Sequence, residues 1–166
     1  MYSKKASFIT QSAIIAALYV AMTYLTFSVS LASGPIQIRF SEALAILPYF
    51  TPAAIPGLFI GCLLSNALTG AVVWDVIFGS LATLLGALIT YALRKTNCKW
   101  IVCIPNILAN TIIVPLVLIY AYGEQSSYYL LFALVAFGEI ISCGVMGTTL
   151  LFCLDKYKHV IFKNRG

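Results

Sequence analysis

The residues that could do chemistry are polar side chains inside long apolar stretches. Glu139 interrupts the stretch 128–154, and Asn110 interrupts the stretch before it, with Asn106 one helical turn away on the same face. A carboxylate at mid-bilayer costs about 2.5–3.5 kcal/mol, so it must face a partner or a wet cavity. The apolar stretches place no lysine or arginine opposite Glu139, which favours a ligand site over a structural role. The asparagines could instead hold helices together by hydrogen bonds.

Further polar and aromatic residues lie near the expected outer ends of these stretches: Gln37, Arg39, Glu42, Asn66, Trp74, Asp75 and Phe78. Two of them, Arg39 and Glu42, could simply pair with each other. Asp75 could serve only to stabilise a helix N-terminus, although it is expected to share a face with the two aromatic residues. Together with Glu139 and Asn110, these residues predict a polar cavity in the outer half of the bilayer. Such a cavity suits a small, flat, hydrogen-bonding ligand, neutral or cationic.

Patterns typical of catalysis are missing from the sequence. It contains no HExxH metal site, no GxSxG nucleophile elbow and no GxxxxGK[ST] phosphate loop. Its single histidine, His159, lies in a basic tail where solvent is expected to surround it. We therefore predict no catalytic residue, no metal and no cofactor. An intramembrane enzyme stays open as a less favoured alternative.

Composition identifies the solvent around these side chains. Of the 166 residues, 61% are hydrophobic and only 9% charged, and the mean hydropathy is +0.99. A soluble domain would carry roughly 25% charged residues to cover its surface. Lipid must therefore surround this chain, and only helices or a closed barrel satisfy the backbone in lipid. The long apolar stretches lack strict alternation, which favours helices.

The expected fold is all-α: one integral membrane domain over residues 1–166, a compact bundle of six transmembrane helices. The spans are predicted at residues 6–29, 41–50, 53–68, 72–93, 100–120 and 128–154. The second span is short, so it either crosses or forms a hairpin with the third. The polar break at residues 33–40 is expected to be extended or re-entrant.

Basic residues at the span ends predict the orientation. Nine of the ten fall on one side of a six-span bundle: Lys4, Lys5, Arg94, Lys95, Lys99, Lys156, Lys158, Lys163 and Arg165. Because basic loops stay in the cytoplasm, both termini are expected there. The loops on the opposite side carry Asp75 and Glu124 instead.

Small residues recur every fourth position on two spans. The first span has Ala13, Ala17 and Ala21, and the third has Gly57, Gly61 and Ser65. Small side chains at this spacing let helix backbones approach closely. They indicate either packing within the bundle or a face that docks the helices of a partner.

Three stretches of the sequence resemble a known family. Residues 34–44 read GPIQIRFSEAL, residues 47–66 read LPYFTPAAIPGLFIGCLLSN, and residues 75–85 read DVIFGSLATLL. These stretches resemble the QueT family of queuosine-precursor transporters, and the similarity extends over nearly the whole chain. The resemblance implies a multi-pass protein of the bacterial plasma membrane. It also implies the role of a substrate-binding (S) component of an energy-coupling factor importer, with a transmembrane coupling protein and two ATPase subunits as partners.

The same resemblance implies a ligand and roles for the site residues. The ligand class would be 7-deazaguanines: the 7-aminomethyl and 7-cyano compounds or queuine. Alanines at the positions of Ala13, Ala17 and Ala21 would dock the coupling protein. Glu139 would accept two N–H groups of the ligand, and Asp75 or Glu42 would bind an amine substituent. Trp74 or Phe78 would stack on the ring, and Asn66 and Asn110 would bind its polar atoms. An S component for another vitamin-like molecule and a stand-alone carrier stay open as alternatives.

Overall fold

The computed structural model describes residues 2–29, 38–96 and 98–161 and contains only helices in these ranges. In chain order they are α1 (Tyr2–Ser28), η1 (Phe40–Tyr49), α2 (Ala54–Leu68), α3 (Val73–Ala92), η2 (Leu93–Lys95), η3 (Lys99–Val102), α4 (Ile104–Tyr122), α5 (Tyr128–Glu139), η4 (Ile140–Gly147) and α6 (Thr148–Ile161). The all-α prediction is confirmed for this part of the chain. Gln37 and most of the predicted break lie outside the described residues.

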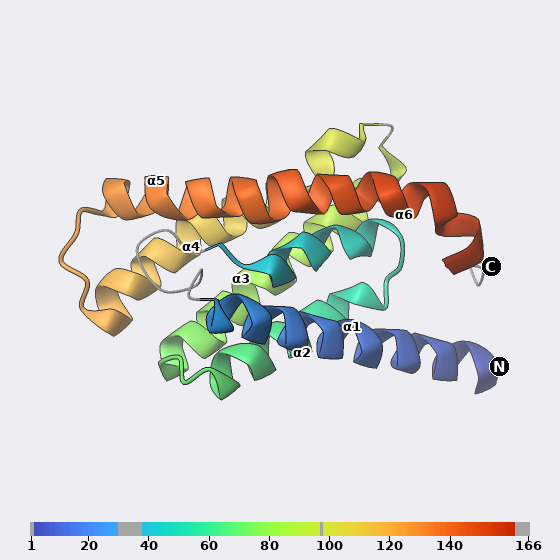
Figure 1. Ribbon diagram of the computed structural model, residues 1–166, viewed down its shortest axis with the longest axis horizontal. Coiled ribbons are helices and arrows are strands. Elements are labelled where there is room, and N and C mark those ends of the chain that lie inside the picture. The colour runs from blue at the N-terminus through green and yellow to red at the C-terminus, as the bar shows by residue number, and fades with distance from the viewer. Residues whose placement is uncertain (1, 30–37, 97, 162–166) are drawn as a thin grey trace.

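The helices form an elongated bundle (Figure 1). α5, η4 and α6 join end to end into one rod along one side, and α1 runs along the other side packed on α2. The short η1 lies between them and contacts η4. The two termini lie at the same end of the bundle.

Four helical stretches are long and apolar enough to cross a membrane: Lys4–Ser28, Val73–Lys95, Lys99–Tyr122 and Tyr128–Tyr157. α2 is apolar but shorter. η1 occupies the place of the short second span, but it is a 3-10 helix, a tighter form that the sequence did not predict. The last predicted span contains an eight-residue π-helix, η4, between α5 and α6.

The surface of the bundle is apolar, and buried polar side chains lie beside an apolar core in its interior. Large apolar side chains such as Ile9, Val73 and Leu108 are exposed, whereas Thr26 and Asn106 are buried. Exposed apolar side chains over several helices are what a lipid solvent requires. The polar groups consequently gather inside the bundle.

Close packing of α1 on α2 depends on glycines. A Cβ atom on Gly57 would lie 2.8 Å from the carbonyl oxygen of Ser12, and one on Gly61 would lie 2.7 Å from the Cβ of Tyr19. Any larger residue would push the helices apart. This observation confirms the packing interpretation of the small residues on α2.

The small residues of α1 lie on a different face. All three alanines are exposed: Ala13, Ala17 and Ala21. They are therefore not used for packing within this chain, and docking of a partner stays a prediction.

An ion pair ties the loop after α3 to the end of the bundle that carries the termini. The Lys99 Nζ atom lies 2.7 Å from a carboxylate oxygen of Asp155 in α6. The basic residues around Lys99 therefore lie at the same end as the C-terminal part of α6, as the charge pattern predicts.

Candidate binding site

The start of η1 is fixed by two hydroxyl groups from distant helices. The first N–H groups of a helix have no partner within it. Here the backbone N–H of Arg39 donates to Ser142 Oγ in η4 at 3.0 Å, and that of Phe40 donates to Thr26 Oγ1 in α1 at 3.0 Å. η1 is thereby held inside the bundle, where it buries Glu42.

Glu42 is the acceptor at the centre of a buried hydrogen-bond network. Its side chain is 2% exposed, and its Oε1 accepts a hydrogen bond from the hydroxyl of Tyr19. Its Oε2 accepts from Nδ2 of Asn106 at 2.8 Å and from Nδ2 of Asn110 at 3.5 Å. A buried carboxylate needs such donors, since burial without them is costly.

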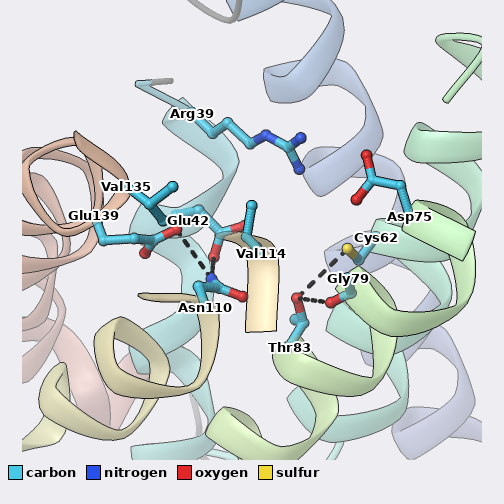
Figure 2. A pocket seen from close by; sticks show the side chains of 10 residues that line it. All are labelled: Arg39, Glu42, Cys62, Asp75, Gly79, Thr83, Asn110, Val114, Val135 and Glu139. Carbon is cyan, nitrogen blue, oxygen red and sulfur yellow. Dashed lines mark hydrogen bonds between the residues drawn. The ribbon is translucent and has the colours of Figure 1, made fainter. Parts of the chain in front are cut away.

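Glu139 shares one of these donors. Its Oε1 accepts from Nδ2 of Asn110 at 3.0 Å, so one amide group bridges Glu139 and Glu42 (Figure 2). The other oxygen, Glu139 Oε2, is buried and has no hydrogen-bond partner among the residues that the structure describes. Buried polar atoms almost always have partners, so this oxygen marks a place where a further donor would bind.

Arg39 and Asp75 lie across from the two glutamates (Figure 2). The Arg39 guanidinium donates to Oδ1 of Asn66 at 3.3 Å. Oδ2 of Asp75 accepts from the Tyr122 hydroxyl at 2.9 Å, and this hydroxyl accepts from the backbone N–H of Val72 at 3.2 Å. Asp75 lies in the first turn of α3, so its position also suits the role of stabilising the helix N-terminus.

These side chains surround a small cavity of about 30 Å³. Its lining residues come from η1 and the residue before it, and from α2, α3, α4 and α5: Arg39, Glu42, Cys62, Asp75, Gly79, Thr83, Asn110, Val114, Val135 and Glu139. A cavity of this volume holds about one water molecule. A purine-sized ligand would therefore have to displace one of the side chains.

Several predicted site residues meet at this cavity. Arg39, Glu42, Asp75, Asn110 and Glu139 line it together. The apolar stretches were expected to place no lysine or arginine opposite Glu139. The cation that lines the same cavity, Arg39, comes instead from the predicted polar break before η1 and had itself been predicted as a site residue.

Trp74 and Phe78 do not line this cavity. They are 58% and 42% exposed, and their rings stack on each other at 5.9 Å between centroids. Both line a separate apolar groove of about 560 Å³ between α3 and α4. The expectation of a face shared with Asp75 was wrong, because Asp75 is 9% exposed and faces the cavity, whereas both rings lie on the exposed side of α3.

Sequence reasoning also missed lining residues that a spacing of four would have revealed. Gly79 and Thr83 follow the predicted Asp75 at this spacing on α3. On α2, Cys62 lies four residues before Asn66, which was predicted but does not line the cavity. The Thr83 hydroxyl lies 3.4 Å from the Cys62 sulfur and closes the cavity on that side. Small and weakly polar side chains carry little signal by themselves, since they are common in apolar helices.

The chemistry of the site is that of an acceptor-rich pocket. Its lining contains three carboxylates and a single guanidinium. Within the described residues, no group of three His, Cys, Asp or Glu side chains is arranged to hold a metal ion. The arrangement is suited to bind a ligand that presents several N–H donors.

The model of a family described as "QueT transporter" matches residues 9–156. The chain therefore belongs to the QueT transporter family. A curated relative, the queuosine precursor transporter QueT of Lactococcus lactis subsp. cremoris (strain MG1363), is 41% identical over 85 residues. This match covers 51% of the chain and about half (50%) of the relative. No solved structure matches the chain.

Family membership and the apolar helices agree on where the chain resides. A transporter acts across a membrane, and four helical stretches can cross one. The chain is a multi-pass protein of the bacterial plasma membrane.

Proposed function

We propose that the chain is the substrate-binding component of an energy-coupling factor importer and captures a 7-deazaguanine precursor of queuosine. The membership of a transporter family supports transport as the general activity. The similarity to a queuosine precursor transporter supports the cargo. In this proposal six helical segments span the bilayer with both termini in the cytoplasm, and the cavity opens toward the outer face.

The buried oxygen Glu139 Oε2 carries the proposal, since it lacks a partner in the described part of the chain. A guanine-like edge presents two adjacent N–H donors, which one carboxylate accepts in a bidentate manner. Glu139 is the proposed acceptor of these donors, with the Asn110 amide beside it to contact a ring atom. Asp75 or Glu42 would bind an amine substituent, and Asn66 a further polar atom. We leave Trp74 and Phe78 out of the proposed contacts because they face another groove.

The partners in the proposal are a transmembrane coupling protein and two ATPase subunits. The sequence has no phosphate-binding loop, so the energy of ATP must come from other chains. The exposed alanines of α1, centred on Ala17, provide a flat strip on which helices of the coupling protein can pack closely.

Equilibrium binding to the purified chain in detergent tests the function. The ligands are 7-aminomethyl-7-deazaguanine, 7-cyano-7-deazaguanine, queuine and guanine. We expect at least one deazaguanine to bind more tightly than guanine, and Glu139→Gln to lower its affinity at least tenfold, about 1.4 kcal/mol. The matched control is Glu124→Gln, since Glu124 is exposed and bonds to Ser126 outside the cavity. A folded sample that binds none of the four ligands would refute the proposed cargo.

A further inference from the structure

The Arg39 guanidinium occupies the position at which a cationic ligand group would bind. It lies over the cavity between Asp75 on one side and Glu42 and Glu139 on the other (Figure 2). The lining contains three carboxylates for this single guanidinium. Because isolated charges are costly inside a membrane protein, these carboxylates need a nearby cation. Arg39 supplies that positive charge from within the chain.

The small volume of the cavity also indicates that Arg39 is the side chain that must move when a ligand binds. The cavity of about 30 Å³ cannot hold a bicyclic ring system. Asn110 bonds to both glutamates, and Asp75 bonds to Tyr122, so these groups are fixed by the network. Arg39 ends in a long side chain with several rotatable bonds, so its guanidinium can move while the backbone before η1 stays in place. Outward movement of Arg39 would enlarge the cavity and uncover the carboxylates together.

We propose that Arg39 is a displaceable counter-ion that makes the site selective for a cationic ligand. This inference rests on the proposed function and specifies its cargo as a 7-deazaguanine that carries a protonated amine. When such a ligand binds, its ammonium group replaces the guanidinium beside the carboxylates, and Arg39 moves outward. A neutral 7-deazaguanine of similar size would displace the guanidinium without replacing its charge, so it binds more weakly.

The test compares two ligands of similar size and different charge. Affinities for 7-aminomethyl-7-deazaguanine and 7-cyano-7-deazaguanine are measured with the unchanged chain, Arg39→Gln and Arg39→Lys. The unchanged chain should prefer the amine at least tenfold. Arg39→Gln removes the competing cation, so affinity for the amine should rise while affinity for the nitrile does not. Arg39→Lys keeps a cation and should keep the original preference.

The control for loss of a positive charge is Arg94→Gln. The Arg94 guanidinium lies 3.7 Å from the centre of the Tyr91 ring and bonds to the Tyr91 carbonyl, away from the cavity. This variant should bind both ligands as the unchanged chain does. Equal effects of Arg94→Gln and Arg39→Gln would overturn the inference, because the effect would then come from overall charge.

Other outcomes separate this inference from the proposed function. If the unchanged chain binds the nitrile as tightly as the amine, the counter-ion role of Arg39 is wrong, although deazaguanine binding holds. The same conclusion follows if Arg39→Gln weakens binding of both ligands equally. If neither ligand nor queuine binds, the proposed function fails as well. Should Arg39→Gln not fold, the preference of the unchanged chain and of Arg39→Lys decides.

Discussion

Removal of one buried hydroxyl, by Tyr19→Phe, should destabilise the bundle. The Tyr19 side chain is 1% exposed and donates its hydroxyl proton to Oε1 of Glu42. The phenylalanine leaves this buried carboxylate oxygen without its donor. Hydrogen bonds between membrane helices average about 0.6 kcal/mol with a maximum near 1.7 kcal/mol. A charged acceptor belongs at the upper end of this range, so we expect a loss of about 1.5 kcal/mol.

A second tyrosine on the same helix provides the matched control. Tyr24 is 41% exposed, and its hydroxyl donates to the Leu68 carbonyl at 3.2 Å. Tyr24→Phe removes the same atom from a neutral, exposed bond, so its cost should stay below about 0.6 kcal/mol. The two variants therefore differ only in the environment of the hydroxyl.

The assay is reversible unfolding in mixed micelles, with the free energy of unfolding measured for each variant. A double-mutant cycle of Tyr19→Phe with Glu42→Gln isolates the pair, and its coupling energy should exceed about 0.5 kcal/mol. Equal destabilisation by Tyr19→Phe and Tyr24→Phe, together with a coupling energy near zero, would refute the reasoning. In that case Glu42 would not depend on Tyr19 for its burial.

Three further predictions address packing, the ligand site and the partner. A Cβ atom on Gly86 would lie 2.6 Å from Oδ1 and 2.8 Å from Cα of Asn106. Gly86→Ala should therefore lower the free energy of unfolding by about 1–3 kcal/mol in the same assay, whereas Gly144→Ala, with 3.7 Å to its nearest neighbour, should change it by less than about 1 kcal/mol. Trp74→Ala should leave deazaguanine affinity unchanged in equilibrium binding, because the ring lies outside the cavity; a large loss would show that the ligand binds elsewhere. Ala17→Trp should abolish ATP-dependent uptake in liposomes that contain the coupling subunits while the isolated chain still binds ligand; unchanged uptake would exclude this face as the docking surface.

The sequence predicted those parts of the site that lie on regular helices. Glu139 and Asn110 were expected at similar depth, and the structure brings them within 3.0 Å of each other. The cost of burying a carboxylate in lipid is large enough that a single Glu in an apolar stretch is informative without any other residue. The α2 glycines were also identified from the sequence, because small residues at every fourth position are a local pattern that indicates close helix packing.

Contacts that depend on irregular backbone could not be predicted in this way. Arg39 was expected in a polar break, because no sequence pattern reports that residues 41–48 of η1 are buried and that η1 lies against η4. The 3-10 form of η1 also escaped prediction, since a mostly apolar segment of ten residues fits several helix types equally well. Helix rotation was the second source of error, because the aromatic pair on α3 was assigned to the face of Asp75.

The irregular segments and the candidate site coincide. η1 carries Glu42 and begins just after Arg39, and η4 begins just after Glu139 and contributes Ser142. η1 and η4 pack on each other, so backbone that departs from the α-helix lies beside the two glutamates of the cavity. A departure of this kind costs stability and persists where the surroundings fix it, which is why π-helices and 3-10 segments often accompany functional sites. In a bundle that could have used regular helices throughout, the combination of such backbone with three buried carboxylates is more readily explained by ligand binding than by folding.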